Sequence, residues 1–562
     1  MTGELQAAGE AQLSGDPLAA IAILEPLCAR EPGDAEARYW LASAKLTAGA
    51  PDADQAMNDA RVLQALPLAQ AMGADTARLR TDAAYAAAVA QELYGRHLVG
   101  LSGVVRALAL AGGSLDAMGL LSYGLSLQHQ GRMEEAAQIF QAVAESFPSA
   151  QAHQFLLFAL LLCQDRETRY PAAAADWAQR YAPSVAAPPF GHAPRAGRKL
   201  RIGYVAPTFA RSQVRQFITP VLEAHDPKAV EVTLYPAKAD TEAGMWPDWI
   251  RVRPIGTLSD ADAAALIRRD HIDVLSDCWG HTAGSRLPVF ARRPAPVQFA
   301  WINFVQTTGL PEMDYVLHAD GPESGAGEVF SEAIWRIGPV FTAFRPPSGR
   351  LDPVPTPALA RGEVTFGSFL HPSKLSDWAL DAWAAALRGA PNSRLLLKYS
   401  YFVDPVLQRA TQARFAARGV APERLAFEGF STGEAYFQAF QQVDLMLDSW
   451  PAPGSTTTLD ALSNGVPVLA KPTACSGGHY VRTILEASGL AELIAESPED
   501  FVERAVALAS DLPRLDALRA RVRPGFEAGP ICDEAGFTRR LEAACGEMFD
   551  AWRLRATARG AA

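Results

Sequence analysis

Short apolar runs alternate with amphipathic helical segments from residue 200 onward, and the alternation occurs in two blocks. In the first block the expected strands are 200–205, 230–235, 272–275 and 297–301, with a helix at 259–269. In the second block they are 364–369, 394–399, 425–428, 445–448 and 468–470. This alternation is typical of βαβ units, which build parallel sheets with helices on both faces. We therefore expect two open α/β units of Rossmann-like type.

The N-terminal part of the chain shows an all-helical repeat pattern instead. Ala8, Gly15, Ala20, Leu24 and Pro32 fit one helix-turn-helix unit of about 34 residues, the tetratricopeptide pattern. The same frame returns at positions 124, 131, 136, 140 and 148. Segments between 35 and 116 fit it poorly, so we interpret them as degenerate repeats with an insertion near 65–80. A plain helical bundle is the alternative.

Two Pro-rich stretches separate these parts, because Pro and Gly interrupt both helices and strands. The predicted order is tetratricopeptide-like helical repeats at 1–181, a linker at 182–198, a first Rossmann-like lobe at 199–344, an interlobe linker at 345–361, a second lobe at 362–530 and a C-terminal helix at 531–562. Ligands of open α/β sheets bind at the carboxyl ends of the strands. A cleft between the two lobes is therefore the expected binding site.

Composition argues against several classes of protein. The net charge of −11 over 562 residues disfavours a nucleic-acid surface, which needs basic patches. Six cysteines are scattered without a C-x-x-C pair, as expected for reduced thiols in a cytoplasmic protein. The strongest apolar run, 155–163, is far shorter than the roughly 18 residues of a membrane span. We expect no nucleic-acid partner, no membrane span and a cytoplasmic location.

The segment 448–470 is the strongest candidate for a ligand site. It is expected to form a strand end, a polar loop, a helix, a turn and a strand. Thr456, Thr457 and Thr458 lie at the start of the expected helix, and the N-terminus of a helix attracts anions such as phosphate. Asp460 follows in the same helix, where its carboxylate could accept hydrogen bonds from a ribose diol. The pattern predicts a nucleotide-sugar site, although Ser and Thr are also ordinary helix caps.

Three further residues of the second block are candidate ligand contacts. Lys374 follows the first strand and could neutralise a diphosphate; a solvated loop lysine is the alternative. Tyr436 could stack on a nucleobase, and packing between helices is the alternative. Arg482 follows a Gly turn and could bind a phosphate, with a surface salt bridge as the equal alternative.

The first block carries Asp277 and His281 after its third expected strand. His281 lies in a Gly-flanked loop and could bind an acceptor or move a proton; a structural His is the alternative. No G-x-G-x-x-G, P-loop, H-E-x-x-H or paired-Cys motif is present, which disfavours dinucleotide, NTPase and zinc chemistry. Asp260-Ala-Asp262 resembles a D-x-D metal motif, but its position after Ser259 indicates a helix start.

Taken in order, these motifs resemble the O-linked N-acetylglucosamine transferase family, including bacterial members and the related plant SPINDLY O-fucosyltransferases. The resemblance spans 199–555. Its matching stretches are Gly-His-Thr-Ala-Gly at 280–284, 293–298, Thr-Thr-Gly-Leu-Pro at 307–311 with 314–315, 366–369 with Lys374, 391–398, Thr-Thr-Thr-Leu-Asp-Ala-Leu at 456–462, 489–494 and a terminal helix ending near Trp552.

The resemblance implies a GT-B glycosyltransferase with two Rossmann-like lobes after a tetratricopeptide-like superhelix. It implies an inverting, metal-independent transfer from a nucleotide-diphospho sugar, UDP-GlcNAc or related, to Ser or Thr hydroxyls of a partner protein. The nucleotide sugar is a co-substrate, and no other cofactor is expected. The repeats would select the protein acceptor, for which flagellin is a candidate by analogy.

The resemblance also assigns roles residue by residue. Lys374, Thr456 and Thr457 would contact the diphosphate, Asp460 the ribose, and Tyr436 the base. The full candidate set is Lys374, His281, Asp270 and Asp277 for catalysis, the last three as alternative general bases, and Ser455, Thr456, Thr457, Asp460, Tyr436 and Arg482 for nucleotide-sugar binding, with no metal ligand.

Two departures bear on the donor. Ser455 stands where N-acetylglucosamine transferases usually have His, and 209–213 reads Phe-Ala-Arg-Ser-Gln where they carry His-Pro. Alternative functions are therefore a transferase for GDP-fucose or a bacterial nonulosonate, or a tetratricopeptide adaptor with an inactive transferase module. A transferase acting on a small molecule or lipid carrier is disfavoured by the helical array.

Overall fold

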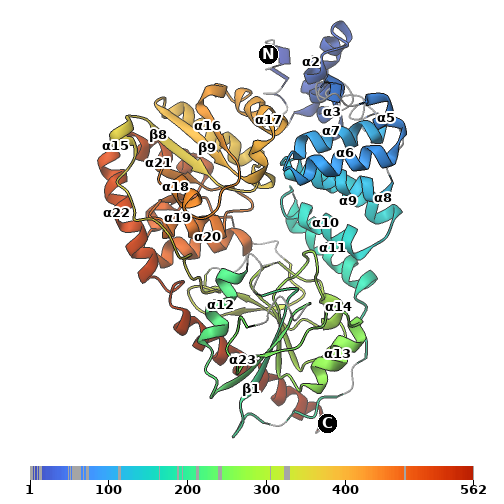
Figure 1. Ribbon diagram of the computed structural model, residues 1–562, viewed down its shortest axis with the longest axis vertical. Coiled ribbons are helices and arrows are strands. Elements are labelled where there is room, and N and C mark those ends of the chain that lie inside the picture. The colour runs from blue at the N-terminus through green and yellow to red at the C-terminus, as the bar shows by residue number, and fades with distance from the viewer. Residues whose placement is uncertain are drawn as a thin grey trace. The chain divides into compact units, whose positions relative to one another are not determined.

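The computed structural model (Figure 1) describes most of the chain in two compact units. The described residues are 4–5, 7–8, 11, 16–48, 50, 52, 65–67, 69–70, 75–111, 116–163, 165–186, 189–192, 194–209, 214–237, 244–303, 306–321, 329–473 and 476–560. Gly15 and positions 210–213, named above, lie outside them, as does Cys475, one of the six cysteines. The first unit comprises Met1–Pro148, His371–Leu375 and Leu395–Phe430, and the second comprises Ser149–Leu370, Ser376–Arg394 and Ser431–Ala562.

The N-terminal part of the first unit is helical, as predicted. Its helices are α2 (Pro17–Arg30), α3 (Ala35–Thr47), α5 (Thr76–Thr81), α6 (Ala83–Gly95), α7 (Val99–Ala111), α8 (Ala117–His129) and α9 (Met133–Ser146). Successive helices pack as the pairs α2–α3, α6–α7 and α8–α9. The next two helices, α10 (Ala150–Leu160) and α11 (Arg166–Tyr181), belong to the second unit, whereas the sequence placed them with the repeats.

The second repeat frame corresponds to a close crossing of α8 and α9. Gly124 lies against the ring of Phe140, and a Cβ at Gly124 would come within 2.4 Å of that ring. Gly131, in the turn between the helices, has a φ of +79°, which favours glycine. The small residues of the frame are therefore required by the approach of the two helices.

Asp404 joins two helices of the first unit that are distant in sequence. Its side chain is buried, and one carboxylate oxygen accepts from the backbone N–H of Val406 (2.8 Å) in α17 (Pro405–Ala416). The other accepts from Gly100 (2.6 Å) and Leu101 (3.2 Å) in the first turn of α7. One carboxylate thus caps two helix N-termini, which are otherwise left with unsatisfied N–H groups.

Asp404→Ala is expected to lower the free energy of unfolding of the first unit by about 3 kcal/mol, because it leaves buried N–H groups of two helices without an acceptor. Asp116→Ala is the matched control, since Asp116 is exposed and caps α8 alone through Gly119 N–H. It is expected to cost about 1 kcal/mol. Urea unfolding monitored by far-UV circular dichroism measures both. Equal losses would contradict the double cap.

The second unit contains a seven-stranded parallel sheet. Its strands are β1 (Leu200–Val205), β2 (Val230–Tyr235), β3 (Arg251–Val252), β4 (Val274–Asp277), β5 (Val297–Ala300), β6 (Tyr315–His318) and β7 (Ala333–Arg336), in the order β3-β2-β1-β4-β5-β6-β7. The strand order reverses between β1 and β4, which is the arrangement of a doubly wound fold. Figure 1 shows α12 (Arg215–Ala224) on one side of this sheet and α13 (Asp260–Arg269) with α14 (Leu287–Phe290) on the other.

A second parallel sheet has the order β10-β9-β8-β11-β12. Its strands are β8 (Val364–Ser368), β9 (Ser393–Lys398), β10 (Leu425–Glu428), β11 (Leu445–Leu447) and β12 (Val468–Leu469). The helices of this part of the chain, besides α17, are α15 (Ala358–Arg361), α16 (Asp377–Gly389), α18 (Glu434–Phe440), α19 (Thr456–Ser463), α20 (Ser476–Ala487), α21 (Pro498–Ser510) and α22 (Leu512–Ala528). The two α/β sheets predicted from the alternation are confirmed.

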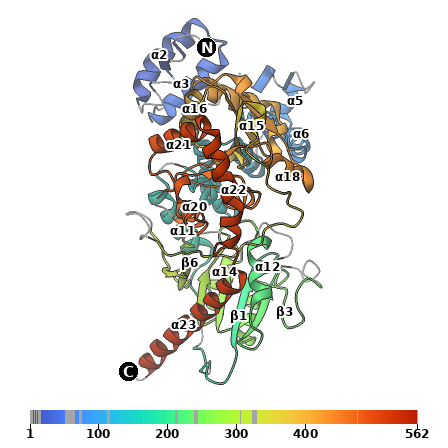
Figure 2. The same ribbon diagram turned by 90° about the vertical axis from the view of Figure 1, so that its left-hand side faces the viewer.

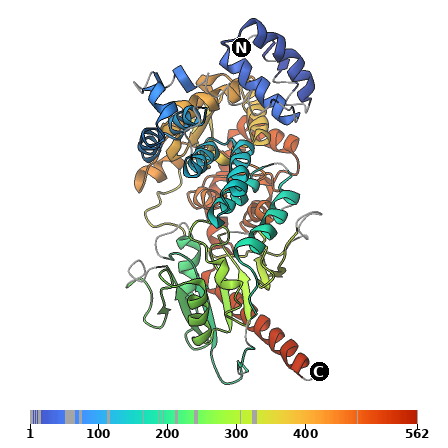
Figure 3. The ribbon, with the colours of Figure 1, turned by 90° about the vertical axis from the view of Figure 1, so that its right-hand side faces the viewer.

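The long C-terminal helix α23 (Glu534–Gly560) packs on α12 and β5. Its buried residues include Phe537, Leu541 and Phe549, whereas the described side chains of 554–558 are exposed. Figures 2 and 3 show this last part projecting beyond the sheet. The sequence predicts a C-terminal helix at 531–562; the observed helix is Glu534–Gly560, and its first half belongs to the core of the first sheet.

Candidate nucleotide-sugar site

The loop after β11 is folded back on its own strand by Asp448. This residue is buried, and its Oδ1 accepts from the backbone N–H of Ser449 (2.9 Å) and of Gly454 (2.6 Å). The Asp448 carbonyl also accepts from the indole of Trp383 (3.1 Å). Residues 448–454 therefore form a closed turn that delivers the chain to the start of α19 at the carboxyl end of β11.

The N-terminus of α19 has the properties of an anion site. Among the described contacts, the side chain of Ser455 makes no capping hydrogen bond to the helix, so the simple capping interpretation is not realised there. Thr456 and Thr457 are partly exposed. The first N–H groups of a helix have no intrahelical acceptor and carry partial positive charge, which suits a phosphate.

Glycine is required at position 454 because a side chain there would clash with its neighbours, and not because of the backbone conformation. A Cβ there would lie 2.6 Å from Thr458 Oγ1 and 2.8 Å from Thr457 Oγ1. Both distances are shorter than any ordinary carbon–oxygen contact. The glycine therefore lets the loop approach the first turn of α19 closely enough to set the position of its threonine hydroxyls.

Asp460 lies one turn further along α19 and is almost fully buried. Its Oδ2 accepts from the hydroxyl of Tyr436 (2.8 Å), while Oδ1 is buried without a hydrogen-bond partner among the described residues. Burial raises the pKa of Asp460 to about 6. A buried carboxylate oxygen with no donor is costly, so a bound ligand that supplies one is the simplest reason for its retention.

Tyr436 is held by contacts on both its ring and its hydroxyl. The ring meets the edge of Phe440, with centroids 5.2 Å apart, and the hydroxyl is bound to Asp460. Burial raises the pKa of Tyr436, so the phenol stays protonated and donates. The observed contact makes Tyr436 a support for Asp460; its stacking on a base stays a prediction.

Arg482 forms the ion pairs that the sequence left as its alternative role. Its guanidinium lies 2.7 Å from Glu496 and 3.5 Å from Glu486. Lys374 lies in the 3-10 turn η1 (Pro372–Lys374), which belongs to the first unit. The contact of either residue with a phosphate stays a prediction.

The candidate general bases of the first sheet occupy different surroundings. Asp277 ends β4, is buried, and accepts from the N–H of Gly280 (2.7 Å) and Trp279 (3.4 Å); burial raises its pKa to about 7. His281 is 1% exposed and its Nε2 lies 2.8 Å from the Thr308 carbonyl. Burial lowers the pKa of His281 to about 4. Both side chains hold the loop after β4 in shape.

Asp270 precedes β4, whereas Asp277 ends it, so the two lie at opposite ends of that strand. Asp270 accepts from the Tyr235 hydroxyl (2.9 Å) and pairs with Arg253 (3.2 Å) and Arg251 (3.5 Å). A general base must reach the acceptor proton at the carboxyl edge of the sheet. The surroundings of Asp270 favour a structural ion-pair network, and the assignment of the base remains a prediction.

Helix α11 contacts the ends of strands from both sheets. Arg166 Nη1 donates to the carbonyl of Pro451 (3.3 Å), in the loop that leads to α19. The Tyr170 hydroxyl donates to the carbonyl of Thr307 (2.9 Å), and the ring of Trp177 meets that of His281 at 4.6 Å. This role could not be predicted from the amino-acid sequence, because the three side chains share only a helical spacing.

Glu332 is a second group that sequence reasoning missed. It is buried and accepts from the Thr307 hydroxyl (2.7 Å) and the Thr308 N–H (2.7 Å). The hydroxyls of Thr307 and Thr308, which lie in the matching stretch 307–311, thus both donate to this carboxylate. Glu332 lies 24 residues or more away in sequence, and no local motif points to the contact.

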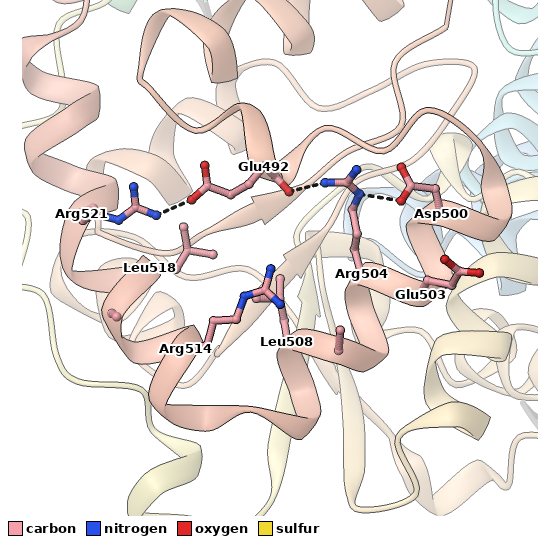
Figure 4. Close-up of a pocket in the computed structure, with 10 residues that line it drawn as sticks. Glu492, Asp500, Glu503, Arg504, Leu508, Arg514, Leu518 and Arg521 are labelled. Atoms are coloured by element: carbon pink, nitrogen blue, oxygen red, sulfur yellow. Dashed lines mark hydrogen bonds and ion pairs between the residues drawn. The ribbon is translucent and has the colours of Figure 1, made fainter.

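A separate pocket of about 450 Å³ lies between α21 and α22 (Figure 4). Its rim is charged, and several of the charges pair with one another. Arg504 contacts Asp500 (2.7 Å) and the Glu492 carbonyl (2.9 Å), and Arg521 pairs with the Glu492 carboxylate. None of the candidate site residues lines it. This pocket therefore has no connection to the predicted chemistry.

Over the described ranges, no group of three or more His, Cys, Asp or Glu side chains is arranged to hold a metal ion. In the same part of the chain, no helix combines the length and apolar character that crossing a membrane requires.

A family model and a solved structure match most of the chain. The model of glycosyl transferase family 41 matches residues 129–332 and 357–541. The O-GlcNAc transferase of Thermobaculum terrenum, solved as a mutant, is 29% identical over 98% of both chains, with a TM-score of 0.74. This structure supports both the helical N-terminal part and the two α/β sheets.

Plant relatives match a similar share of the chain, 63 to 65% of it. A probable UDP-N-acetylglucosamine–peptide N-acetylglucosaminyltransferase, SPINDLY, of Oryza sativa subsp. japonica is 34% identical over 372 residues, which cover 63% of this chain and 39% of the relative. The corresponding SEC protein of Arabidopsis thaliana is 27% identical over 395 residues, covering 65% and 39%. The chain thus spans about two fifths of the length of these curated relatives.

Proposed function

Because the chain belongs to glycosyl transferase family 41, we propose that it is a protein O-glycosyltransferase that transfers N-acetylglucosamine from UDP-GlcNAc to Ser or Thr hydroxyls of a partner protein. The observation that carries the proposal is the pairing of two features on α19. Among the described residues, no side chain caps the N-terminus of the helix, where Thr456 and Thr457 lie, and one turn later Asp460 offers a buried carboxylate oxygen with no donor. A nucleoside diphosphate presents an anion and a diol in that order.

In the proposed reaction the acceptor hydroxyl attacks the anomeric carbon of the sugar. The bond between that carbon and the β-phosphate oxygen breaks, and the nucleoside diphosphate leaves with the bonding electrons. The N-terminus of α19, Thr456 and Thr457 stabilise the charge that develops on the leaving diphosphate, with Lys374 as the cationic partner. The hydroxyl proton passes to a general base, for which Asp277 is the candidate at the carboxyl edge of the first sheet. No metal ion or further cofactor takes part.

The helical repeats are proposed to bind the acceptor protein. Stacked helix pairs present an extended surface that suits peptides. The names of the plant relatives describe peptide substrates, which favours a protein acceptor over a small molecule or lipid carrier.

The experiment is donor-dependent labelling. Purified full-length chain is incubated with UDP-GlcNAc or GDP-fucose and a lysate of the source cells, and intact-mass spectrometry follows the proteins. We expect a mass gain of one N-acetylhexosamine on Ser or Thr with UDP-GlcNAc, lost in Thr456→Ala/Thr457→Ala. A mass gain of one deoxyhexose with GDP-fucose would instead identify GDP-fucose as the donor. This is the alternative that Ser455 leaves open.

A tetratricopeptide adaptor with an inactive module is distinguished by nucleotide binding. An enzyme gains thermal stability with UDP by linkage, whereas an adaptor that binds no nucleotide shows no shift with UDP, GDP or CMP. No shift and no hydrolysis of any nucleotide sugar by folded protein would overturn the proposed function.

A further inference from the structure

The turn η1, which carries Lys374, begins with a histidine cap. His371 Nδ1 accepts from the backbone N–H of Ser373 (3.0 Å) and lies 2.7 Å from the Ser373 hydroxyl. Burial lowers the pKa of His371 well below its ordinary value, so the ring is neutral and Nδ1 can accept. The conformation of η1 therefore depends on the position of this ring.

The His371 ring is packed in a partly buried histidine–tyrosine cluster made of Tyr94, His129, His371, Tyr399 and Tyr401. His129, the last residue of α8, stacks on Tyr401 at 4.7 Å and meets the edge of His371 at 5.1 Å. The Tyr94 hydroxyl of α6 lies 3.3 Å from His129 Nδ1. Burial lowers the pKa of His129 to about 4, which keeps this ring neutral as well. The cluster thus connects two repeat helices to the cap of η1.

The backbone of η1 is held by a second contact with the repeats. The turn between α8 and α9 approaches it so closely that a Cβ at Gly131 would lie 2.7 Å from the Pro372 carbonyl oxygen. On its other side, Arg414 of α17 donates to the Leu375 carbonyl (2.7 Å). Residues 371–375 are therefore clamped at both ends, and one side of the clamp comes from the helical repeats.

We propose that His129 and Gly131 are positioning residues for donor binding, which act through His371 and Pro372 on Lys374. This inference rests on the proposed function, in which Lys374 neutralises the diphosphate. It assigns the repeat pair α8–α9 a part in holding the nucleotide, in addition to the proposed binding of the acceptor. Motion of this pair on acceptor binding would then change the affinity for the donor.

The test uses two matched glycine substitutions in the full-length chain. Gly131→Ala and Gly197→Ala both place a side chain at a φ near +79° (+79° and +78°), so their backbone strain is similar. At Gly197 the new Cβ meets nothing within 4 Å, whereas at Gly131 it meets the Pro372 carbonyl. We expect Gly131→Ala to weaken UDP binding about tenfold in isothermal titration calorimetry, the effect of losing one well-placed charged contact, and Gly197→Ala to leave it unchanged.

A double-mutant cycle separates positioning from general destabilisation. If Gly131 acts through Lys374, Gly131→Ala weakens UDP binding no further in a Lys374→Ala background. A full additive effect there, or unchanged affinity in Gly131→Ala, overturns the inference. Failure of the unsubstituted chain to bind any nucleotide overturns the proposed function instead.

A second pair of variants keeps the inference testable if Gly131→Ala does not fold. His371→Asn retains an acceptor near the position of Nδ1 and can cap η1, whereas His371→Leu fills the space without an acceptor. UDP affinity is expected to be kept more closely in His371→Asn than in His371→Leu. Equal affinities in the two folded variants would overturn the role of the cap.

Discussion

Asp460→Ala is expected to lower the affinity for UDP by about a hundredfold, because two hydrogen bonds from the ribose diol to a charged acceptor are lost, each contributing about 1.5 kcal/mol or more. Isothermal titration calorimetry with UDP measures the change. Tyr436→Phe is the matched control: it removes only the hydroxyl that donates to Oδ2 and leaves the carboxylate in place. Its effect is expected to be about tenfold at most. Equal losses in both variants would contradict a direct contact of Asp460 with the ligand.

The same residue predicts a pH dependence of donor binding. The diol donates to the ionised carboxylate, and burial raises the pKa of Asp460 to about 6. The affinity for the nucleotide-sugar donor is therefore expected to be highest above pH 6 and to fall as the pH drops through that value. UDP-GlcNAc is the ligand of choice, because its diphosphate lacks the terminal phosphate group that titrates near pH 6. In Asp460→Asn this dependence is expected to disappear.

The free energy of unfolding is expected to depend on pH in the opposite sense to donor binding. The raised pKa means that the folded state holds a proton that the unfolded state has released between about pH 4 and pH 6. The ionised carboxylate therefore costs stability as the pH rises through this window. Asp460→Asn is expected to be at least as stable as the unsubstituted chain at pH 7 while binding nucleotide poorly, which is typical of a residue kept for function.

Gly454→Ala is expected to reduce kcat/KM for the sugar donor by about a hundredfold, since small displacements of a positioned group can cost that much. The new Cβ would force Thr457 and Thr458 away from Gly454, and with them the first turn of α19. Transfer or donor hydrolysis, measured by release of UDP, reports the loss.

Gly33→Ala is the control for this substitution. Gly33 has no atom within 4 Å of an added Cβ and lies in the helical N-terminal part. Its kcat/KM is expected to stay unchanged. If Gly454→Ala retained normal kcat/KM, the first turn of α19 would not be part of the donor site.

Much of the fold could be predicted because the signals were local. The expected strands 200–205, 230–235 and 425–428 match β1, β2 and β10 residue for residue, since each is an apolar run bounded by polar turns. Ser259 caps α13 through the Asp262 N–H (3.1 Å), as expected from its position before two aspartates. The third expected strand, 272–275, corresponds to β4 at Val274–Asp277, two residues later than expected, because Ile272 packs in the core just before the ladder begins.

In the candidate site, too, the features that depend on neighbouring residues could be predicted, and those that depend on distant segments could not. The Thr456–Asp460 pattern could be found because a helix start and a carboxylate one turn later are close in sequence. The partners of the other candidates could not. Arg482 pairs with Glu496, and His281 packs on Trp177, 104 residues away in the chain. Whether a polar side chain faces a ligand or another side chain depends on which distant segment packs beside it.

The sequence by itself determined the all-helical first part, the two parallel α/β sheets and the helix start that carries Thr456 and Asp460, because periodicity, turn chemistry and helix caps depend on residues close together in the chain. Only the tertiary structure decided that Asp460 keeps a buried oxygen without a donor among the described residues, that Asp404 caps two helices, and that α8 and α9 support the turn of Lys374. These properties arise from burial and from contacts between distant segments, and burial sets the cost of every unsatisfied polar group.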